Sequence, residues 1–302
     1  MQDTVVVRYG ELFLKSDYVR RKFEEKLLEN ISATLKDKKF NFKIVKKRLR
    51  CVIKTDKPHE VAEAVAKVFG VVSTSPAVFV SSNLDEISEV SVKIAERTIK
   101  KNNTFAVQAK RTGKHEFSSK DVEVLVGKKI QEKTGAKVNL DNPEKIIFIE
   151  IHDEETFIFT EKIRGVGGLP YGTQGKLVAL VSDLNSGVAA FMLMRRGCEI
   201  VGLHFGEESE VRDILKKLEE YSPKKLKLII NNKKIPKEKM YQIAEEIAKR
   251  ENAFGVVSGE LLDDLSPVNL KIPIYRPLVG LNGDKISKTA KEIRLIAKHI
   301  NL

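Results

Sequence analysis

The chain of 302 residues contains no tryptophan and only two cysteines, Cys51 and Cys198. The two cysteines lie far apart and form no Cys-x-x-Cys pair, which argues against both a disulfide framework and a zinc ribbon. The five histidines show no metal-ligand spacing such as His-Glu-x-x-His. We therefore expect no metal site built from histidine or cysteine.

Long apolar runs are also absent. No segment has the length that a membrane span requires, and the start of the chain, Met1-Gln2-Asp3 before a short valine run, lacks the layout of a signal peptide. These absences predict a soluble cytoplasmic protein with no membrane partner. The length favours two or three domains.

Acidic residues are outnumbered by basic ones. The chain has 54 Lys and Arg against 42 Asp and Glu, a formal net charge of +12 and a pI near 9.4. Such an excess favours a polyanionic partner; a Lys- and Glu-rich surface of the kind found in heat-adapted proteins is the alternative. Because aromatic residues make up only 7% of the chain, we expect a duplex or folded RNA rather than a stacked single strand.

Hydrophobic periodicity divides the chain into three parts. The first alternates strands and helices in a compact α+β pattern that is typical of a ferredoxin-like unit. Its expected elements are strands at 4–9, 40–45 and 50–54, a helix from Ser16 or Asp17, and a helix at 58–69 that ends before Gly70.

The second part, about 71–165, mixes two helices with several strands. Its expected elements are helices at 84–101 and 121–134 and strands at 105–111, 138–140, 146–151 and 157–159. A glycine-rich stretch then ends in Gly175-Lys176. Because this pair precedes a strand rather than opening a helix, it argues against a Walker-type phosphate loop.

The third part, 176–302, alternates strands with helices, which predicts a parallel sheet with right-handed crossovers. Its expected strands are 177–181, 199–204, 224–230 and 254–258 with a short apolar segment at 272–274, and its expected helices are 186–196, 209–221, 236–250 and 284–299. The apolar run 177–181 stops at Ser182-Asp183-Leu184-Asn185-Ser186, and a helix pattern follows. A turn of this kind is where a phosphate would bind, at a strand's carboxyl end and a helix N-terminus.

Nearly the whole chain resembles the tRNA 4-thiouridine synthetase family (tRNA sulfurtransferases). The stretch from Gly167 to Lys176, which resembles the linker into the catalytic domain of that family, is the most specific match. The other matching stretches are Val7 to Lys15, Phe105 to Arg111, Phe117-Ser118-Ser119, Val138 to Pro143, Arg195 to Phe205 and Arg276 to Gly280.

The resemblance implies an α/β and α+β multidomain fold. The implied domains are an N-terminal ferredoxin-like domain at 1–57, a THUMP RNA-binding domain at 58–165, a linker at 166–175, and a PP-loop pyrophosphatase-like (adenine nucleotide α-hydrolase-like) parallel-sheet domain at 176–302. It further implies that tRNA is the partner, that ATP with Mg²⁺ adenylates a uridine oxygen, and that sulfur then displaces AMP. A cysteine desulfurase as sulfur donor and a homodimer are also implied.

The resemblance places two sets of binding residues on this chain. The implied ATP-binding residues are Leu180, Val181, Ser182, Ser186, His204, Phe205, Lys237 and Gly259. The implied RNA phosphate contacts are Lys110, Arg111, Lys114 and Lys120, for which a solvated rim is the alternative.

The nucleotide loop departs from the family pattern Ser-Gly-Gly-x-Asp-Ser. Here Ser182-Asp183-Leu184-Asn185-Ser186 is one residue shorter and has no glycine. Asp183 and Asn185 are the candidate catalytic residues, and the Asp183 carboxylate would repel a triphosphate unless Mg²⁺ lay between them.

Two further departures concern the same domain. Gly259-Glu260 is followed by Asp263-Asp264 where the family has Gly-Gln, and no cysteine stands at the sulfur-accepting position of the family. We interpret Cys198 as a packed core thiol. A second hypothesis therefore stands beside the enzyme: an RNA-binding protein of the same fold with an inactive nucleotide site.

Overall fold

A computed structural model describes residues 3–10, 16–47, 50–233, 235–265 and 267–295. Residues 11–15 of the family-like stretch Val7 to Lys15 and the end of the expected helix 284–299 lie outside these ranges. Contacts divide the chain into two compact units. Unit 1 comprises Met1–Arg8, Phe40–Ala66 and Ser73–Arg164, and unit 2 comprises Tyr9–Lys39, Lys67–Val72 and Gly165–Leu302.

The first strands form an antiparallel group with a valine-rich centre. Strand β1 (Thr4–Tyr9) pairs antiparallel with β3 (Arg50–Lys54), which pairs antiparallel with β2 (Lys43–Lys47). The side chains of Val5, Val6 and Val7 are fully buried. Helix α2 (Pro58–Ala66) ends earlier than the apolar pattern predicts, but the order of elements is the expected one.

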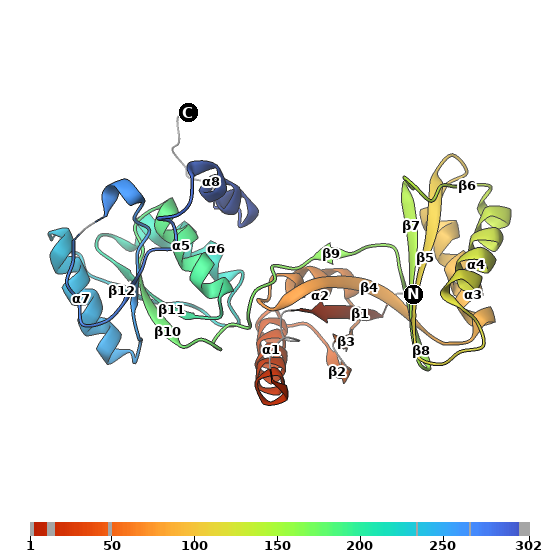
Figure 1. The fold of residues 1–302 in the computed structure, drawn as a ribbon, viewed down its shortest axis with the longest axis horizontal. Coiled ribbons are helices and arrows are strands. Elements are labelled where there is room, and N and C mark those ends of the chain that lie inside the picture. The colour runs from red at the N-terminus through yellow and green to blue at the C-terminus, as the bar shows by residue number, and fades with distance from the viewer. Residues whose placement is uncertain (1–2, 11–15, 48–49, 234, 266, 296–302) are drawn as a thin grey trace. The chain divides into compact units, whose positions relative to one another are not determined.

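The other strands of unit 1 continue the same sheet through β4, and two helices cover one face of its β8-β7-β5 part (Figure 1). Helix α4 begins at a capping box between Ser118 and Asp121 and ends at Gly135, whose φ of 71° suits glycine. The elements are β4 (Val71–Ser81), α3 (Leu84–Thr98), β5 (Thr104–Thr112), α4 (Ser119–Thr134), β6 (Lys137–Val138), β7 (Lys145–His152), β8 (Glu155–Phe159) and β9 (Ile163–Arg164).

Unit 2 contains a five-stranded sheet in the order β12-β11-β10-β13-β14, in which each strand pairs parallel with its neighbours. This confirms the parallel sheet predicted for the third part of the chain. The strands are β10 (Lys176–Leu180), β11 (Glu199–His204), β12 (Lys227–Ile230), β13 (Val256–Val257) and β14 (Ile274–Tyr275).

Helices cover both faces of this sheet, so that β10 and β11 are buried from either side (Figure 1). Helices α5 (Leu184–Arg195), α6 (Glu208–Glu219) and α8 (Gly283–Glu292) share one core. Helix α7 (Lys237–Arg250) packs on the other face through Tyr241 and Ala244. Burial on both faces explains why β10 reads as an uninterrupted apolar run.

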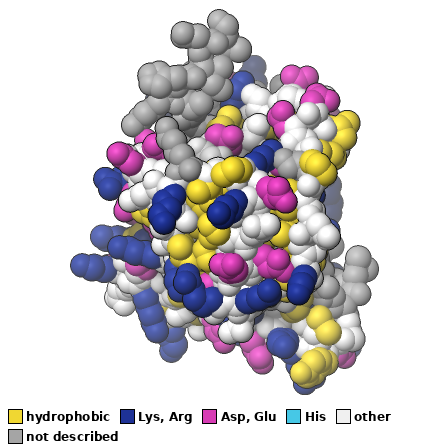
Figure 2. All heavy atoms as spheres, turned by 90° about the vertical axis from the view of Figure 1, so that its left-hand side faces the viewer, with side chains coloured by type: hydrophobic (Ala, Val, Ile, Leu, Met, Phe, Trp, Pro, Cys, Tyr) yellow, Lys and Arg dark blue, Asp and Glu magenta, His cyan; other side chains and the backbone are white. Residues whose placement is uncertain are grey.

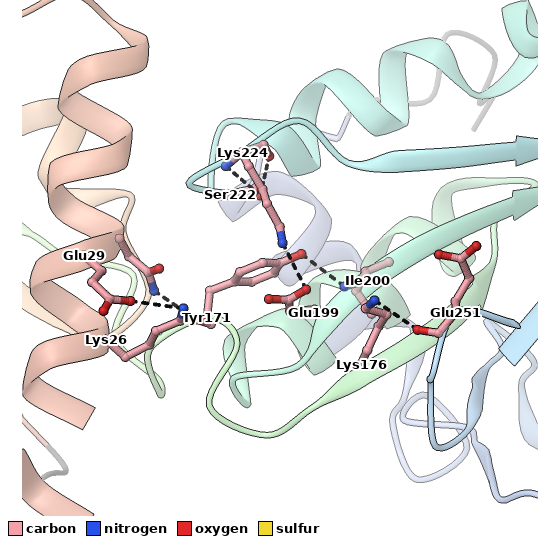
Figure 3. Close-up of polar contacts among 10 residues, drawn as sticks. Lys26, Glu29, Tyr171, Lys176, Glu199, Ile200, Ser222, Lys224 and Glu251 are labelled. Atoms are coloured by element: carbon pink, nitrogen blue, oxygen red, sulfur yellow. Dashed lines mark hydrogen bonds and ion pairs between the residues drawn. The ribbon is translucent and has the colours of Figure 1, made fainter. Parts of the chain in front are cut away.

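The linker before β10 is held to helix α1 (Asp17–Asp37) and to the sheet by Tyr171 (Figure 3). The carbonyl of Tyr171 accepts a hydrogen bond from the Asn30 side chain at 3.0 Å, and its hydroxyl oxygen accepts one from the Ile200 amide at 3.1 Å. Burial raises the pKa of this phenol to about 12. These bonds fix the linker where the chain enters the sheet.

Within the described residues no helix is both long and apolar enough to cross a membrane.

Candidate functional site

A cavity of about 330 Å³ lies at the carboxyl end of β10, where the sequence predicts a phosphate site. Its walls come from β10, the start of α5, the end of β11, helix α7 and the segment after β13. The lining residues are Leu180, Val181, Ser182, Asp183, Asn185, Ser186, Leu203, Phe205, Lys237, Met240, Tyr241, Ser258, Gly259, Glu260 and Asp264. The structure therefore brings together both candidate catalytic residues and every expected nucleotide contact except His204.

The loop at the start of α5 is closed by its own side chains. The carboxylate of Asp183, the N-cap residue, accepts a hydrogen bond from the Ser186 amide at 2.8 Å. The Ser186 hydroxyl accepts from the amides of Ser182 and Asp183, both at 2.9 Å, and donates to the Asp183 carbonyl at 2.7 Å. Three backbone amides of the loop are thus already bonded.

The helix therefore begins at Leu184, two residues before the predicted start at Ser186. The pattern Asp183-x-x-Ser186 is the sequence signal for this start, because an aspartate N-cap bonds the amide three residues later. The first two helical amides, at Leu184 and Asn185, have no acceptor within the helix by its geometry. They remain the donors that this loop can offer to a ligand.

Gly259 packs directly against the loop. A Cβ at position 259 would lie 2.6 Å from the Ser186 Cα and 2.7 Å from the Asn185 carbonyl carbon. Both are backbone atoms, so no side-chain rotation would relieve the overlap. The segment after β13 thus fixes the position of the loop, and only glycine permits this approach.

Glu260 lines the cavity and forms ion pairs with two basic side chains, Lys237 and Arg276. Its carboxylate lies 2.6 Å from the Lys237 Nζ and 2.6 Å from the Arg276 Nε, and its side chain is 6% exposed. Burial opposes its ionisation, but the hydrogen bonds from Lys237 and Arg276 outweigh burial and lower the pKa of the carboxyl. Lys237 also donates to the Asp264 carbonyl at 3.1 Å.

His204 lies behind the cavity rather than in its wall. It is 2% exposed, its Nδ1 lies 2.8 Å from the Val181 carbonyl oxygen, and its Nε2 lies 3.3 Å from the Glu210 carboxylate. The Nδ1–H group therefore donates to Val181. His204 positions the end of β10, and the adjacent Phe205 reaches the cavity.

The expected RNA contacts lie in unit 1, around the carboxyl end of β5 and the start of α4. Lys110, Lys114 and Lys120 are exposed. Arg111 donates to the Gly113 carbonyl at 3.0 Å and lies 3.2 Å from the His115 Nδ1, so it also shapes the turn after β5.

Charges of both signs cover the side of unit 2 that carries α7 (Figure 2). Lysine and arginine side chains surround hydrophobic patches there, and Asp and Glu lie among them. This side of unit 2 is therefore a surface of mixed charge.

Both thiols are buried. Burial raises the pKa of Cys51 to about 12 and also raises the pKa of Cys198, whose Sγ lies 4.0 Å from the Gln174 carbonyl. Cys198 is 5% exposed and belongs to the unit 2 core, as expected. Neither cysteine presents a thiolate to a substrate in this structure.

Comparison with curated proteins gives close relatives along nearly the whole chain. A probable tRNA sulfurtransferase of Methanocaldococcus jannaschii is 37% identical, and the alignment covers 96% of this chain and 87% of that protein. A probable tRNA sulfurtransferase of Thermococcus kodakarensis is 35% identical over 97% of this chain and 88% of the relative. The chain belongs to the tRNA sulfurtransferase family.

Family models divide this tRNA sulfurtransferase homologue in the expected order. A ThiI ferredoxin-like domain matches residues 4–75, a THUMP domain matches 81–161, and the model described as Thiamine biosynthesis protein (ThiI) matches 172–300. The expected fold classes are thereby confirmed.

Two solved structures resemble the chain along almost its entire length. PH1313 from Pyrococcus horikoshii has a TM-score of 0.84 at 30% identity and covers 97% of this chain and 99% of its own. A 4-thiouridine synthetase in complex with RNA and ATP has a TM-score of 0.83 at 29% identity, covering 97% and 85%.

The relatives also carry residues that this sulfurtransferase family member lacks. The alignment with the Methanocaldococcus protein runs over 332 positions, whereas this chain has 302 residues. The relative therefore has residues inside the aligned region without a counterpart here.

Proposed function

We propose that this protein is a tRNA sulfurtransferase of the 4-thiouridine synthetase type, which binds tRNA and uses ATP to adenylate a uridine for sulfur transfer. The observation that carries the proposal is the cavity at the end of β10. Expected nucleotide contacts from five separate segments surround it, among them Ser182, Phe205, Lys237 and Gly259.

The chemistry of the lining fits an adenine nucleotide. Leu180, Leu203, Phe205 and Met240 offer apolar surface for a base, and the loop amides and Lys237 lie where phosphates would bind. Asp183 would hold a Mg²⁺ ion that arrives with ATP, because a carboxylate is a preferred magnesium ligand. Adenylation turns a poorly leaving uridine oxygen into part of AMP, which a sulfur nucleophile displaces.

The proposed RNA contacts are Lys110, Arg111, Lys114 and Lys120, which would neutralise tRNA phosphates. We further propose a homodimer in the cytoplasm with a cysteine desulfurase as sulfur donor. The limits 1–57, 58–165, 166–175 and 176–302 remain our proposal for the domains.

A second candidate function is tRNA binding without nucleotide chemistry. The observation that favours it is the bonding within the loop. The Asp183 carboxylate occupies the helix N-terminus, and Ser186 engages the amides of Ser182 and Asp183. A phosphate bound there would have to displace these bonds and would meet a negative charge.

Release of pyrophosphate distinguishes the two functions. Purified protein is incubated with radiolabelled ATP, Mg²⁺ and unmodified tRNA, and tRNA binding is measured in the same buffer. If the protein is an enzyme, we expect tRNA-dependent release of pyrophosphate. Lys237→Ala should lower the rate of release at least about tenfold, a loss of about 1.4 kcal/mol in transition-state stabilisation. Lys249→Ala, which removes an exposed lysine of the same helix, is the matched control and should not change the rate. Bound tRNA without release would establish the second function.

A further inference from the structure

Unit 2 contains another cavity, of about 570 Å³, at the opposite end of α5 from the nucleotide cavity. Its walls come from the last turns of α5, from β14 and the residues after it, and from α8. The lining residues are Phe191, Met192, Leu193, Arg195, Arg196, Ile274, Tyr275, Arg276, Pro277 and Thr289. The helix separates the two cavities by roughly 15 Å, at 1.5 Å per residue.

Two arginines that line this cavity have no acidic partner within the part of the chain that the structure describes. Among the residues that the structure describes, Arg195 and Arg196 form no ion pair and no side-chain hydrogen bond, although Arg195 is half-buried. Arg276, in contrast, is bound to Glu260. The C-terminus of α5 favours positive charge at this position, and no nitrogen of either guanidinium is among the buried polar atoms that lack a partner, so their N–H donors are open to solvent. An external anion can therefore reach them.

The remaining lining is apolar and partly exposed. Met192, Leu193, Tyr275 and Pro277 offer a surface on which a flat ring can pack. A guanidinium fork matches the oxygens of a phosphate in geometry as well as charge. The lining therefore suits a ligand that carries both an anionic group and a flat ring, and a nucleotide has both.

We propose that this cavity binds a phosphate-bearing nucleotide of RNA, with Arg195 and Arg196 on the phosphate and Tyr275 against the base or ribose. This contact lies on the catalytic unit and is additional to the proposed contacts of unit 1. The net charge of +12 agrees with an RNA ligand that is held by more than one part of the chain.

The test uses the full chain and a short single-stranded RNA oligonucleotide that carries a photoreactive uridine. Its affinity is measured over a range of salt concentrations for wild type and for Arg195→Ala combined with Arg196→Ala. We expect at least about tenfold weaker binding, and a salt dependence whose slope falls by about 1.4, because each contact to a single strand contributes about 0.7. Crosslinks should map to peptides that contain Met192 or Tyr275.

Arg212→Ala is the matched control, since Arg212 is exposed on α6 and paired with Glu208. An equal loss in this control, or an unchanged slope in the double variant, would overturn the proposal. So would displacement of the RNA by a polyglutamate peptide whose own binding requires both arginines, because the cavity would then serve an acidic protein segment.

Two measurements keep the result interpretable. Thermal unfolding checks that the double variant folds. If it does not, Arg196→Glu replaces it in the test, because this variant changes only an exposed side chain and should also weaken RNA binding. Pyrophosphate release with ATP and tRNA is followed separately, so that failure of this contact is distinguished from failure of the proposed enzyme.

Discussion

The carboxylate of Asp183 and the amide of Ser186 are 2.8 Å apart, and this bond fills the helix N-terminus that faces the cavity. Parallel α/β sheets usually leave such a terminus for an anion from outside. Here the chain supplies its own anion. Side chains of the loop itself thus hold its backbone, and a bound triphosphate would be repelled by the Asp183 carboxylate.

Replacing Asp183 with Asn should separate capping from charge. Asparagine is a good N-cap, so the loop should keep its conformation while it loses its negative charge. Without divalent metal, we expect ATP to bind about tenfold more tightly, a gain of about 1.4 kcal/mol, with adenosine unaffected. With Mg²⁺ the gain should disappear, because wild type then uses its carboxylate as a metal ligand. Calorimetric titration checks this; an equal change for adenosine would point to a rearranged cavity.

Gly259→Ala should disturb the loop from the neighbouring segment. The new methyl group would overlap the backbone of Ser186, and we expect a loss of about 2 kcal/mol in the free energy of unfolding together with weaker nucleotide binding. Gly280→Ala is the control, because a Cβ at 280 meets no atom within 4 Å. Denaturant titration of both variants gives the comparison, and similar values for the two would contradict the role of the close contact.

Glu150 should make unit 1 sensitive to acid. Burial opposes its charge, but His152 and Arg8, whose Nη2 lies 3.0 Å from Glu150, lower the pKa of the carboxyl from 4.5 to about 2. Because the folded-state pKa is depressed, the stabilisation is complete above about pH 4.5 and is lost as the pH falls toward 2. Its size is on the order of 3 kcal/mol, from about 1.4 kcal/mol for each pKa unit.

Glu150→Gln tests this assignment. The free energy of unfolding of wild type minus that of the variant should shrink as the pH falls from 5 toward 2. A difference that stays constant over this interval would show that another carboxylate carries the acid sensitivity.

Lys110 and Lys114 should contribute charge rather than structure. Both side chains are exposed, so their combined replacement by alanine should leave the unfolding temperature unchanged while weakening tRNA binding. The slope of log affinity against log salt should fall by about 1.8, since each duplex phosphate contact contributes about 0.9. Lys93→Ala, on the exposed face of α3, is the control. An unaltered slope would place the phosphate contacts elsewhere.

The strand–turn–helix at 177–195 could be predicted from sequence because its signals are local. An apolar run buried on both faces, an abrupt polar turn and a helical stripe follow one another within a short stretch. The predicted helix start at Ser186 is wrong by two residues, because Asp183 caps the helix through the Ser186 amide and the helix begins at Leu184.

Other features were missed because their partners are distant in sequence or their local signals conflict. The cluster of Glu260, Lys237 and Arg276 joins three segments that only the parallel sheet brings together. Strand β4 contains Ser-Thr-Ser-Pro at 73–76, a composition typical of a turn. The segment was therefore not predicted as a strand, although Ala77-Val78-Phe79-Val80 has a strand-like composition and most of β4 is buried.

The burial of Cys51 and Cys198 has a practical consequence. Thiol reagents act on accessible thiolates, and neither native cysteine offers one under mild conditions. A single cysteine introduced at an exposed position outside the proposed contacts, such as Lys128 in α4, could be labelled with a dye or spin probe while the native thiols are kept. Spectroscopy on such a derivative would follow the motion of one chosen surface in the otherwise native chain as RNA is added.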